Sequence, residues 1–180
     1  MEEMNPPERI ETERLVLRKP RMDDVPVIFE AYAQDPEVTR YLVWKAHKNV
    51  QETEQFITAY LQLWQMGRDF AYAITLKEND KLIGMFGLHP MKFNLEVGYG
   101  LARPFWKKGY MTEALRTMIE WAFTQPEVFR VQATCDIENI ASARVMEKAG
   151  MTREGLLRRY ILHPNLSSEP RDVYMYAIIR

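Results

Sequence analysis

The stretch RPFWKKGYMTEA, residues 103–114, combines residue types that can bind a phosphate group. It reads as the end of a strand, a tight turn and the start of a helix. The first turn of a helix carries unpaired N–H groups and a partial positive charge, so an anion placed there gains hydrogen bonds and a favourable dipole. Gly109 allows the backbone an unusual dihedral angle, and Lys107 and Lys108 add positive charge. The alternative is an ordinary strand–turn–helix connection with solvated lysines.

Two familiar phosphate-binding loops do not fit this stretch. A P-loop needs two glycines, the second followed by Lys and then Ser or Thr, and a dinucleotide fingerprint needs Gly-x-Gly-x-x-Gly near the first strand. The neighbouring VGYGLARP contains Gly98 and Gly100, but the third glycine is absent and no helix follows directly. A turn with one glycine is weak evidence by itself, so the phosphate assignment depends on other parts of the chain.

Two further segments carry side chains suited to acid–base chemistry or ligand binding. Glu96, in LEVGYGL, lies among apolar residues on an expected strand, which makes it a candidate general base; the alternative is a carboxylate at a rim or in a salt bridge. Downstream, NIASARVMEKAGM reads as a helix that follows a strand. Asn139 suits the N-cap of this helix, and Ser142 falls in its first turn.

These segments resemble the motifs of a known family. VGYGLARPFWKKGYMTEA and NIASARVMEKAGM, in this order, resemble the two cofactor motifs of the GNAT superfamily of N-acetyltransferases. The part from ETERLVLRKPRMDD to DPEVTRYLVW is similar to the ribosomal-protein N-terminal acetyltransferase branch of that superfamily. The resemblance runs from about Ile10 to the C-terminus, and it implies an acetyl-CoA-dependent N-acetyltransferase with acetyl-CoA as cosubstrate.

By this resemblance, the phosphate in the turn is the pyrophosphate of acetyl-CoA. The superfamily pattern Gln/Arg-x-x-Gly-x-Gly/Ala falls on residues 106–111, with Trp106 at the first position and Met111 at the last, where a small residue is usual. The strand before the turn is expected to pair its backbone with the pantetheine arm, as an added strand would. The cofactor-binding residues so implied are Leu101, Ala102, Arg103, Lys107, Lys108, Gly109, Tyr110, Met111, Thr112, Asn139, Ser142 and Lys148.

Acetyl transfer to an amine needs a neutral amine, a polarised thioester carbonyl and a proton for the leaving thiolate. The resemblance implies Glu96 as the catalytic base, acting through a water, and an N–H near Leu101 as the group that polarises the carbonyl. Many members place a tyrosine acid where this chain has Met146, so Ser142 or water must protonate the thiolate. Three aromatic residues are candidates for the acceptor pocket or for the core: Tyr41, Trp44 and Tyr160.

The amine acceptor is the least constrained part of this hypothesis. An α-amino group has a pKa of about 7.7–8.0 and a lysine side chain one of about 10.4, so far more of the α-amine is neutral at pH 7. One moderate base and a serine therefore favour a protein N-terminus as acceptor. A small-molecule amine such as an antibiotic, a polyamine or an amino-acid derivative stays open. A non-catalytic coenzyme A-binding module also stays open, because methionine replaces the usual acid.

The elements that must position these residues follow from periodicity and turn signals. Strands are expected over 14–20, 70–76, 81–91, 94–102, 128–136, 152–162 and 172–179. Helices are expected over 22–34, 49–67, 111–123 and 139–150, with a short helical turn over 35–42. The three-strand meander indicates antiparallel pairing, and the later strand–helix–strand crossover indicates parallel pairing. We therefore predict an α/β (α+β) fold with a mixed, mostly antiparallel central sheet of about seven strands flanked by helices. The resemblance adds that the sheet splays in the middle.

Composition narrows the functional class. The chain has 180 residues and a formal net charge of −1, without a basic excess or stripe, so we expect no nucleic-acid partner. We expect a single domain over residues 1–180, with a loose lead-in over 1–9, that acts as a monomer or homodimer. No apolar run approaches the length of a membrane span, and Cys135 has no partner for a disulfide, so we expect a cytoplasmic protein. The three histidines, His47, His89 and His163, look isolated, so we predict no metal site.

Overall fold

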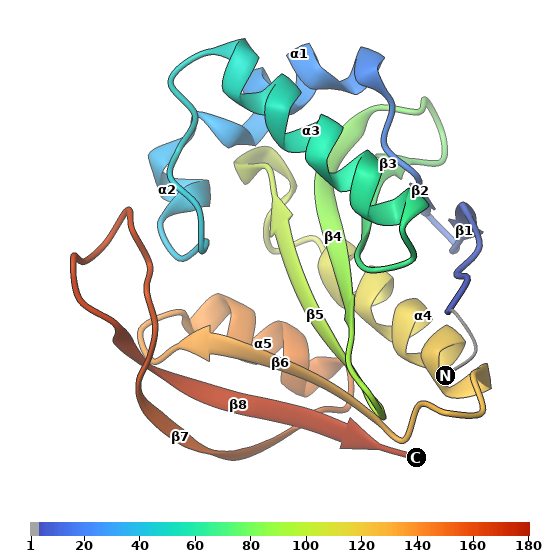
Figure 1. Cartoon of the computed structure of the whole chain (residues 1–180), viewed down its shortest axis with the longest axis vertical. Coiled ribbons are helices and arrows are strands. Elements are labelled where there is room, and N and C mark those ends of the chain that lie inside the picture. The colour runs from blue at the N-terminus through green and yellow to red at the C-terminus, as the bar shows by residue number, and fades with distance from the viewer. Residues whose placement is uncertain (1–3) are drawn as a thin grey trace.

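Eight strands form one mixed sheet in the computed structural model of the chain, which describes residues 4–180. Their order across the sheet is β1-β2-β3-β4-β5-β6-β8-β7 (Figure 1). The strands are β1 (Arg9–Glu11), β2 (Leu15–Arg18), β3 (Phe70–Leu76), β4 (Leu82–Pro90), β5 (Asn94–Leu101), β6 (Arg130–Asp136), β7 (Thr152–Ile161) and β8 (Arg171–Ile179). The helical segments are η1 (Met22–Asp24), α1 (Val25–Ile28), η2 (Phe29–Ala33), α2 (Pro36–Thr39), α3 (Val50–Gln65), η3 (Arg103–Phe105), α4 (Tyr110–Thr124) and α5 (Ile140–Lys148).

The strand directions confirm the prediction of a mostly antiparallel sheet. Within residues 4–180, β5 and β6 are the only neighbouring strands that run parallel, and α4 makes the crossover between them. The sheet has eight strands rather than about seven, because Arg9–Glu11 pairs with β2 at the end of the expected lead-in. That strand contains one apolar residue, Ile10, so no hydrophobic alternation reveals it in the sequence.

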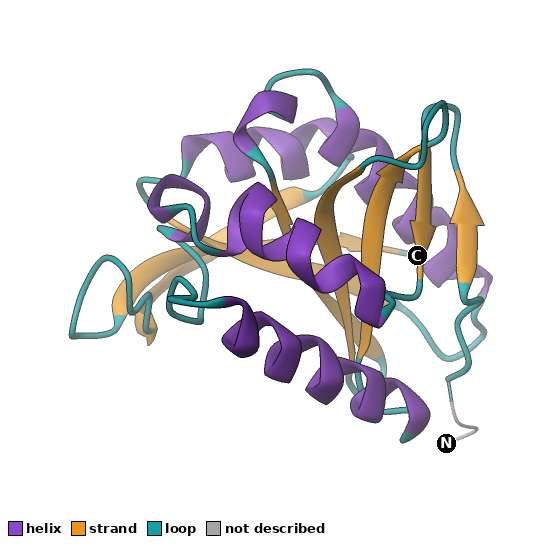
Figure 2. Cartoon of the chain, turned by 90° about the horizontal axis from the view of Figure 1, so that it is seen from above, coloured by secondary structure: helices purple, strands orange, loops and turns teal. Residues whose placement is uncertain are grey.

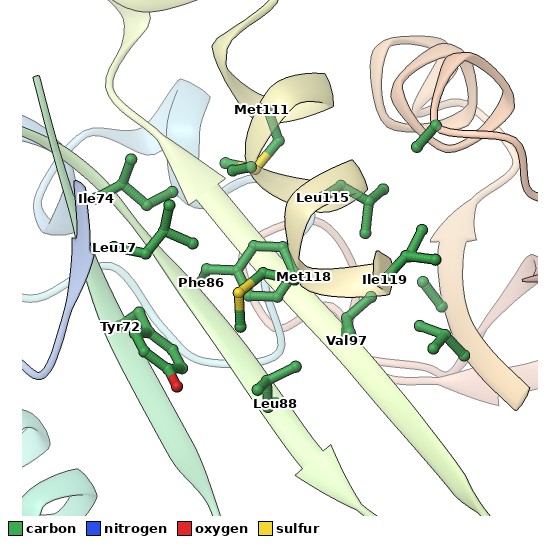
Figure 3. Close-up of a cluster of buried hydrophobic side chains, with 14 of the residues drawn as sticks. Leu17, Tyr72, Ile74, Phe86, Leu88, Val97, Met111, Leu115, Met118 and Ile119 are labelled. Atoms are coloured by element: carbon green, nitrogen blue, oxygen red, sulfur yellow. The ribbon is translucent and has the colours of Figure 1, made fainter. Parts of the chain in front are cut away.

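Helices cover both faces of the sheet (Figure 2). On one face, α4 packs its apolar side over the middle strands in the larger core, where Met118 lies close to Phe86 (Figure 3). On the other face, α1 and α3 pack on a smaller core. The alternation of side chains along β3 divides the two cores, since Tyr72 belongs to the larger one and its neighbours Ala71 and Ala73 belong to the smaller one.

The sheet opens between β5 and β6, as expected. Their ladder joins only Asn94–Glu96 to Arg130–Gln132, and the rest of β5 has no partner on that side. Beyond the ladder the two strands diverge, as Figure 1 shows, while β6 stays paired with β8 along its whole length. We call residues 97–101 the open edge of β5. The short helix η3, the turn and the N-terminus of α4 follow it in the chain.

Local signals placed most helix ends correctly. Asn49 and Asn139 cap α3 and α5 by accepting hydrogen bonds from the backbone N–H groups of Glu52 and Ser142. The helix expected over 22–34 is instead a series of short segments, η1, α1 and η2, that includes a π-helical turn. Among the helices of residues 4–180, none is both long enough and apolar enough to cross a membrane.

Candidate functional site

The turn between η3 and α4 presents a row of free backbone donors. Within residues 4–180, none of the N–H groups from Lys107 to Thr112 donates to a protein acceptor; the first one that does in this helix is the N–H of Glu113, bonded to the carbonyl oxygen of Gly109. Six neighbouring N–H groups at the positive end of a 15-residue helix are suited to binding an anion. This geometry favours the phosphate interpretation over an ordinary connection.

Gly109 gives the turn its shape. It is the N-cap of α4 and has φ of 81° and ψ of −2°, in the left-handed region that residues with a Cβ rarely adopt. Lys107 also has a positive φ, 61°, so the chain reverses direction within three residues. The side chains of Lys107 and Lys108 are exposed on either side of the turn. The backbone therefore forms the floor of the anion site and the lysines stand at its rim.

A cluster from the β1–β2 connection (residues 12–14) and α4 holds the turn in place. The Arg14 guanidinium donates to the carbonyl oxygen of Lys108 at 3.1 Å and to the Glu113 carboxylate at 2.6 Å. Glu113 also accepts from the Thr12 hydroxyl at 2.5 Å and from the backbone N–H of Arg14. Burial alone would raise the pKa of Glu113, but these hydrogen bonds and the Arg14 charge lower it. Glu113 therefore stays ionised and anchors α4 to the β1–β2 connection, while Arg14 lies over the ring of Tyr110.

The side chain of Met111 does not occupy the turn. Met111 is 6% exposed and its side chain belongs to the larger core, where Figure 3 shows it on the side of α4 that faces Ile74 and Leu17. Only its backbone N–H faces the anion site. The methionine side chain therefore does not fill the turn, although a small residue is usual at this position.

The open edge of β5 carries a second set of free backbone groups. Ala102 donates its N–H to the carbonyl oxygen of Ile83, which fixes the direction of the peptide groups along this strand. Alternate residues of an antiparallel strand direct their backbone groups to the same neighbour, so those of Tyr99 and Leu101 point away from β4. They face the side where β6 has diverged. A linear ligand could pair with them as an added strand.

Three backbone or side-chain groups expected at this edge are already engaged. The Trp106 indole N–H donates to the carbonyl oxygen of Leu101, and the N–H of Ala102 is used by Ile83. The Arg103 guanidinium donates to Asp35 at 2.6 Å. The N–H of Leu101 is thus the group of this segment best placed for a ligand.

Helix α5 places the Ser142 hydroxyl next to the Tyr99 hydroxyl, on the face of β5 that packs against the larger core. The Tyr99 hydroxyl lies 3.0 Å from the Ser142 hydroxyl oxygen and 3.4 Å from the Ser142 carbonyl oxygen. Burial raises the pKa of Tyr99, so its hydroxyl stays protonated and can donate to Ser142. Asn139 uses its side-chain oxygen for the cap, which leaves its NH₂ group for a ligand. Met146 is fully buried in the core and supplies no proton.

A groove of about 650 Å³ lies beside the turn, between the first turns of α4 and the end of α5. Its lining includes Lys148 and both basic and acidic side chains of α4 and of the β1–β2 connection; the residues are Glu13, Arg14, Gly109, Thr112, Glu113, Arg116, Thr117, Glu120 and Lys148. Arg116 donates to the carbonyl oxygen of Lys148, which ties the two helices together at this point. The exposed Lys148 ammonium can therefore reach an anionic group bound in the groove next to the turn.

Glu96 lies on the opposite face of β5 from Tyr99, where the β5–β6 ladder ends. It is half-buried and sits opposite His89 of β4 and opposite Gln132 of β6. The Gln132 amide donates to the Glu96 carboxylate at 3.2 Å. Gly98 and Gly100 follow on the same face, so β5 itself carries no side chains on this face from Glu96 to the end of the strand. The glycines on this face are Gly98 and Gly100 of β5 and Gly87 of β4, and we call them the backbone floor. Glu96 borders this floor beside the open edge.

The predicted acceptor-pocket aromatics are not brought together. Trp44 packs with Tyr32, His47 and Phe56 in the smaller core, so it contributes to packing. Tyr41 contacts His163, and Tyr160 is 55% exposed on the edge strand β7. Among the described residues, no group of three or more His, Cys, Asp or Glu side chains has the arrangement of a metal site.

Sequence reasoning missed Tyr99, Arg14 and His89. Tyr99 alternates with Leu95 and Val97, which are buried, so it reads as a core residue. Arg14 reaches the turn from 94 positions away in the chain. The expectation that His89 is isolated is wrong, because its Nδ1 lies 2.9 Å from the Asp69 carboxylate. One signal in the sequence could have linked His89 to Glu96. The connection between β4 and β5 is short, so a hairpin with a known turn places these two residues opposite each other.

A family model described as an acetyltransferase (GNAT) domain matches residues 14–152 of the chain. The match includes the open edge of β5, the turn, and α4 through α5. A curated relative, the uncharacterized N-acetyltransferase p20 of Bacillus licheniformis, is 32% identical over 176 residues, which is 96% of this chain and 97% of p20.

Solved structures of similar proteins share the architecture. A GNAT-family acetyltransferase from Bacillus anthracis matches with a TM-score of 0.82 at 30% identity, over 95% of this chain and 98% of that one. RimL, a ribosomal L7/L12 alpha-N-protein acetyltransferase in complex with coenzyme A, matches with a TM-score of 0.84 at 22% identity, over 96% and 98% of the two chains. At this lower identity the second likeness shows the fold alone.

Proposed function

Because the chain belongs to the GNAT family of acetyltransferases, we propose that it transfers the acetyl group of acetyl-CoA to the α-amino group of a protein N-terminus. The observation that carries this proposal is the row of free N–H groups from Lys107 to Thr112, directly after the open edge of β5. One site binds an anion and the other pairs with an extended chain. A pyrophosphate joined to a pantetheine arm has both of these features.

In this proposal, the backbone holds most of the cosubstrate. The N–H groups of the turn bind the pyrophosphate, and Lys107, Lys108 and Lys148 contribute charge around it. The N–H and carbonyl of Tyr99 and the N–H of Leu101 pair with the pantetheine amides, together with the free NH₂ group of Asn139. The N–H of Leu101 was the group expected to polarise the thioester carbonyl. That N–H and the N–H of Tyr99 lie on the same edge, so both are available for this role.

The reacting groups approach from both faces of β5. The Glu96 carboxylate attracts the ammonium form of the acceptor and draws its proton, through a water. The neutral amine attacks the thioester carbon, and the carbon–sulfur bond breaks. The Ser142 hydroxyl protonates the leaving thiolate, while Tyr99 donates to Ser142. The overall reaction consumes an ammonium group and acetyl-CoA and yields an amide, coenzyme A and one proton.

Two arguments support a protein N-terminus as the acceptor: the pKa of an α-amine and the described activity of a structurally similar protein. No strongly activated base is needed for an α-amine, because its pKa of about 7.7–8.0 leaves a useful neutral fraction at pH 7. RimL, which shares the fold, is described as an alpha-N-protein acetyltransferase. A protein N-terminus is also a flexible chain end that can reach the backbone floor beside Glu96.

Two measurements test the proposed function. Calorimetry with acetyl-CoA should show binding, and no heat at millimolar ligand would refute the cosubstrate. Thiol release should then be followed with a panel of amines: peptides that begin with serine or alanine, Nα-acetyl-lysine, spermidine and an aminoglycoside. Thiol release with the peptides alone supports the proposal. Thiol release with a small amine instead would mean that the acceptor is a small molecule. Acetyl-CoA binding without thiol release on any amine indicates a non-catalytic module.

The hydroxyl pair makes a specific prediction. Replacing Ser142 with alanine should lower kcat about tenfold, less than the roughly 100-fold typical of a lost acid, because water and Tyr99 can still supply a proton. Tyr99→Phe should have a smaller effect of the same kind. The control is Ser168→Ala, which removes an exposed hydroxyl from the β7–β8 loop. A Ser142→Ala enzyme with the full rate would mean that water protonates the thiolate.

A further inference from the structure

His89 forms a charge cluster that the proposed reaction has not used. Its Nδ1 lies 2.9 Å from the Oδ2 atom of Asp69, a residue of the loop between α3 and β3. An ionised carboxylate can only accept hydrogen bonds, so Nδ1 carries the proton and Nε2 is the free, basic nitrogen of the neutral ring. An imidazole whose Nδ1–H is held by a carboxylate is oriented to take up a proton at Nε2.

The free nitrogen lies over the backbone floor beside the open edge of β5. A Cβ atom built on Gly87 would be 3.0 Å from Nε2, and one built on Gly98 would be 3.7 Å from it. Nε2 is therefore above β4 and β5, at the point where two glycines leave the floor bare. Gly98 immediately precedes Tyr99, whose backbone faces the separation of the strands. The Nε2 atom of His89 thus lies one residue along β5 from Tyr99, whose N–H is one of the two that the proposed function offers to the thioester carbonyl.

Two carboxylates flank His89, one from each side. Asp69 holds Nδ1, and Glu96 lies directly opposite His89 in the β4–β5 ladder. Burial alone would lower the pKa of His89, but the hydrogen bond to Asp69 and the negative charges of Asp69 and Glu96 outweigh it and raise the pKa above its ordinary value. Nearby, burial and the charge of Asp69 raise the pKa of Tyr60 to about 12, so that hydroxyl stays neutral.

A carboxylate alone is poorly matched to the proton that must be removed. An ordinary glutamate has a pKa of about 4.3, more than three units below that of an α-amine, so it holds the proton only briefly. An ordinary imidazole has a pKa of about 6.5, which is much closer to that of the amine, and the surroundings of His89 shift its pKa further in that direction. Proton transfer is most effective when the acceptor's pKa is near the working pH.

We infer that His89, held by Asp69, takes up the proton that the acceptor amine loses. This inference rests on the proposed function. The proton leaves the ammonium nitrogen beside Glu96, passes through water to Nε2 of His89 and gives an imidazolium between Asp69 and Glu96. His89 is partly exposed, with 39% of its side chain accessible, so the imidazolium then returns the proton to solvent. No other reactant is needed, since the overall reaction already releases one proton.

The first test uses the free protein and needs no acceptor. Long-range ¹H–¹⁵N NMR spectra of the imidazoles should show His89 protonated at Nδ1 when neutral, with a pKa above 6.5 that falls in Asp69→Asn. His47 is the internal control, because burial lowers its pKa. A neutral His89 protonated at Nε2, or a His89 pKa that Asp69→Asn leaves unchanged, would overturn the inference.

The second test measures turnover against pH with a serine-starting peptide and acetyl-CoA. The basic form of His89 is required, so the rate should fall as the pH drops through its raised pKa. His89→Gln should lower kcat about tenfold at pH 7, less than the roughly 100-fold typical of a lost base, because Glu96 remains. Asp69→Asn should move the acidic limb to lower pH, a shift that titration of the peptide itself cannot produce. His47→Gln, the matched control, should leave the profile unchanged.

The two hypotheses fail in different ways. If the wild-type enzyme releases no thiol with any amine of the panel, the proposed function is wrong and this inference falls with it. If the wild type is active and His89→Gln keeps both its rate and its pH profile, only the role of His89 is wrong.

Discussion

Replacing Gly109 with valine is expected to weaken the binding of coenzyme A about 100-fold, because two charge-assisted hydrogen bonds worth roughly 1.5 kcal/mol or more each would be lost. Gly109 has φ of 81°, and a β-branched residue is a strong outlier in that region. The turn must then adopt another conformation, which misaligns the N–H groups that follow. The steric contact itself is minor, since a Cβ atom would lie 3.4 Å from the flexible Arg14 guanidinium.

Gly67 provides a matched control for this experiment. It also has a positive φ, 64°, and nothing lies within 4 Å of a Cβ built there. Gly67→Val therefore introduces similar backbone strain, of about 1–2 kcal/mol, at the end of α3 and far from the turn in the sequence. Calorimetry should show normal coenzyme A affinity for Gly67→Val and weak affinity for Gly109→Val. Equal affinity in the two variants would mean that the backbone of the turn does not bind the cosubstrate.

Glu96→Gln is expected to lower kcat about 100-fold, a typical loss for a missing acid–base group, and to leave coenzyme A affinity nearly unchanged. The amide keeps the shape of the side chain, but it removes the negative charge that attracts the ammonium group and stabilises the His89 imidazolium. Glu96 lies on the face of β5 away from Ser142 and before the open edge, so the cosubstrate contacts stay intact.

The measurement compares initial rates of thiol release with calorimetric affinity for coenzyme A. Glu78→Gln removes the same charge from an exposed position in the β3–β4 turn and serves as the control. A Glu96→Gln enzyme that turns over at the wild-type rate would remove Glu96 from the proton path. A variant with lost affinity and normal kcat would place Glu96 in cosubstrate binding instead.

Local signals in the sequence were sufficient for most of the fold. Caps such as Asn49 and Asn139, and glycines such as Gly67 and Gly150, mark helix ends through short-range hydrogen bonds and backbone sterics. Alternating apolar residues mark the longer strands. The strand β1 was missed because three residues with one apolar side chain are stabilised only by pairing with β2.

The parts of the site formed by backbone groups of one continuous segment were predicted from the sequence. The parts formed by contacts between side chains of different elements were missed. The turn around Gly109 could be recognised because its residues are adjacent in the sequence. The Tyr99–Ser142 and Asp69–His89 contacts join residues 43 and 20 positions apart, so they follow from strand register and helix placement. Sequence periodicity assigns Tyr99 to the core and leaves His89 without a partner.

The proposed function is tested most directly by the position at which a peptide becomes acetylated. A peptide that begins with serine and carries one internal lysine would be incubated with the protein and acetyl-CoA and then sequenced by mass spectrometry. The proposed function predicts a single acetyl group on the α-amine, with one coenzyme A released for each peptide modified. An unmodified peptide, or an acetyl group on the lysine side chain, would contradict it.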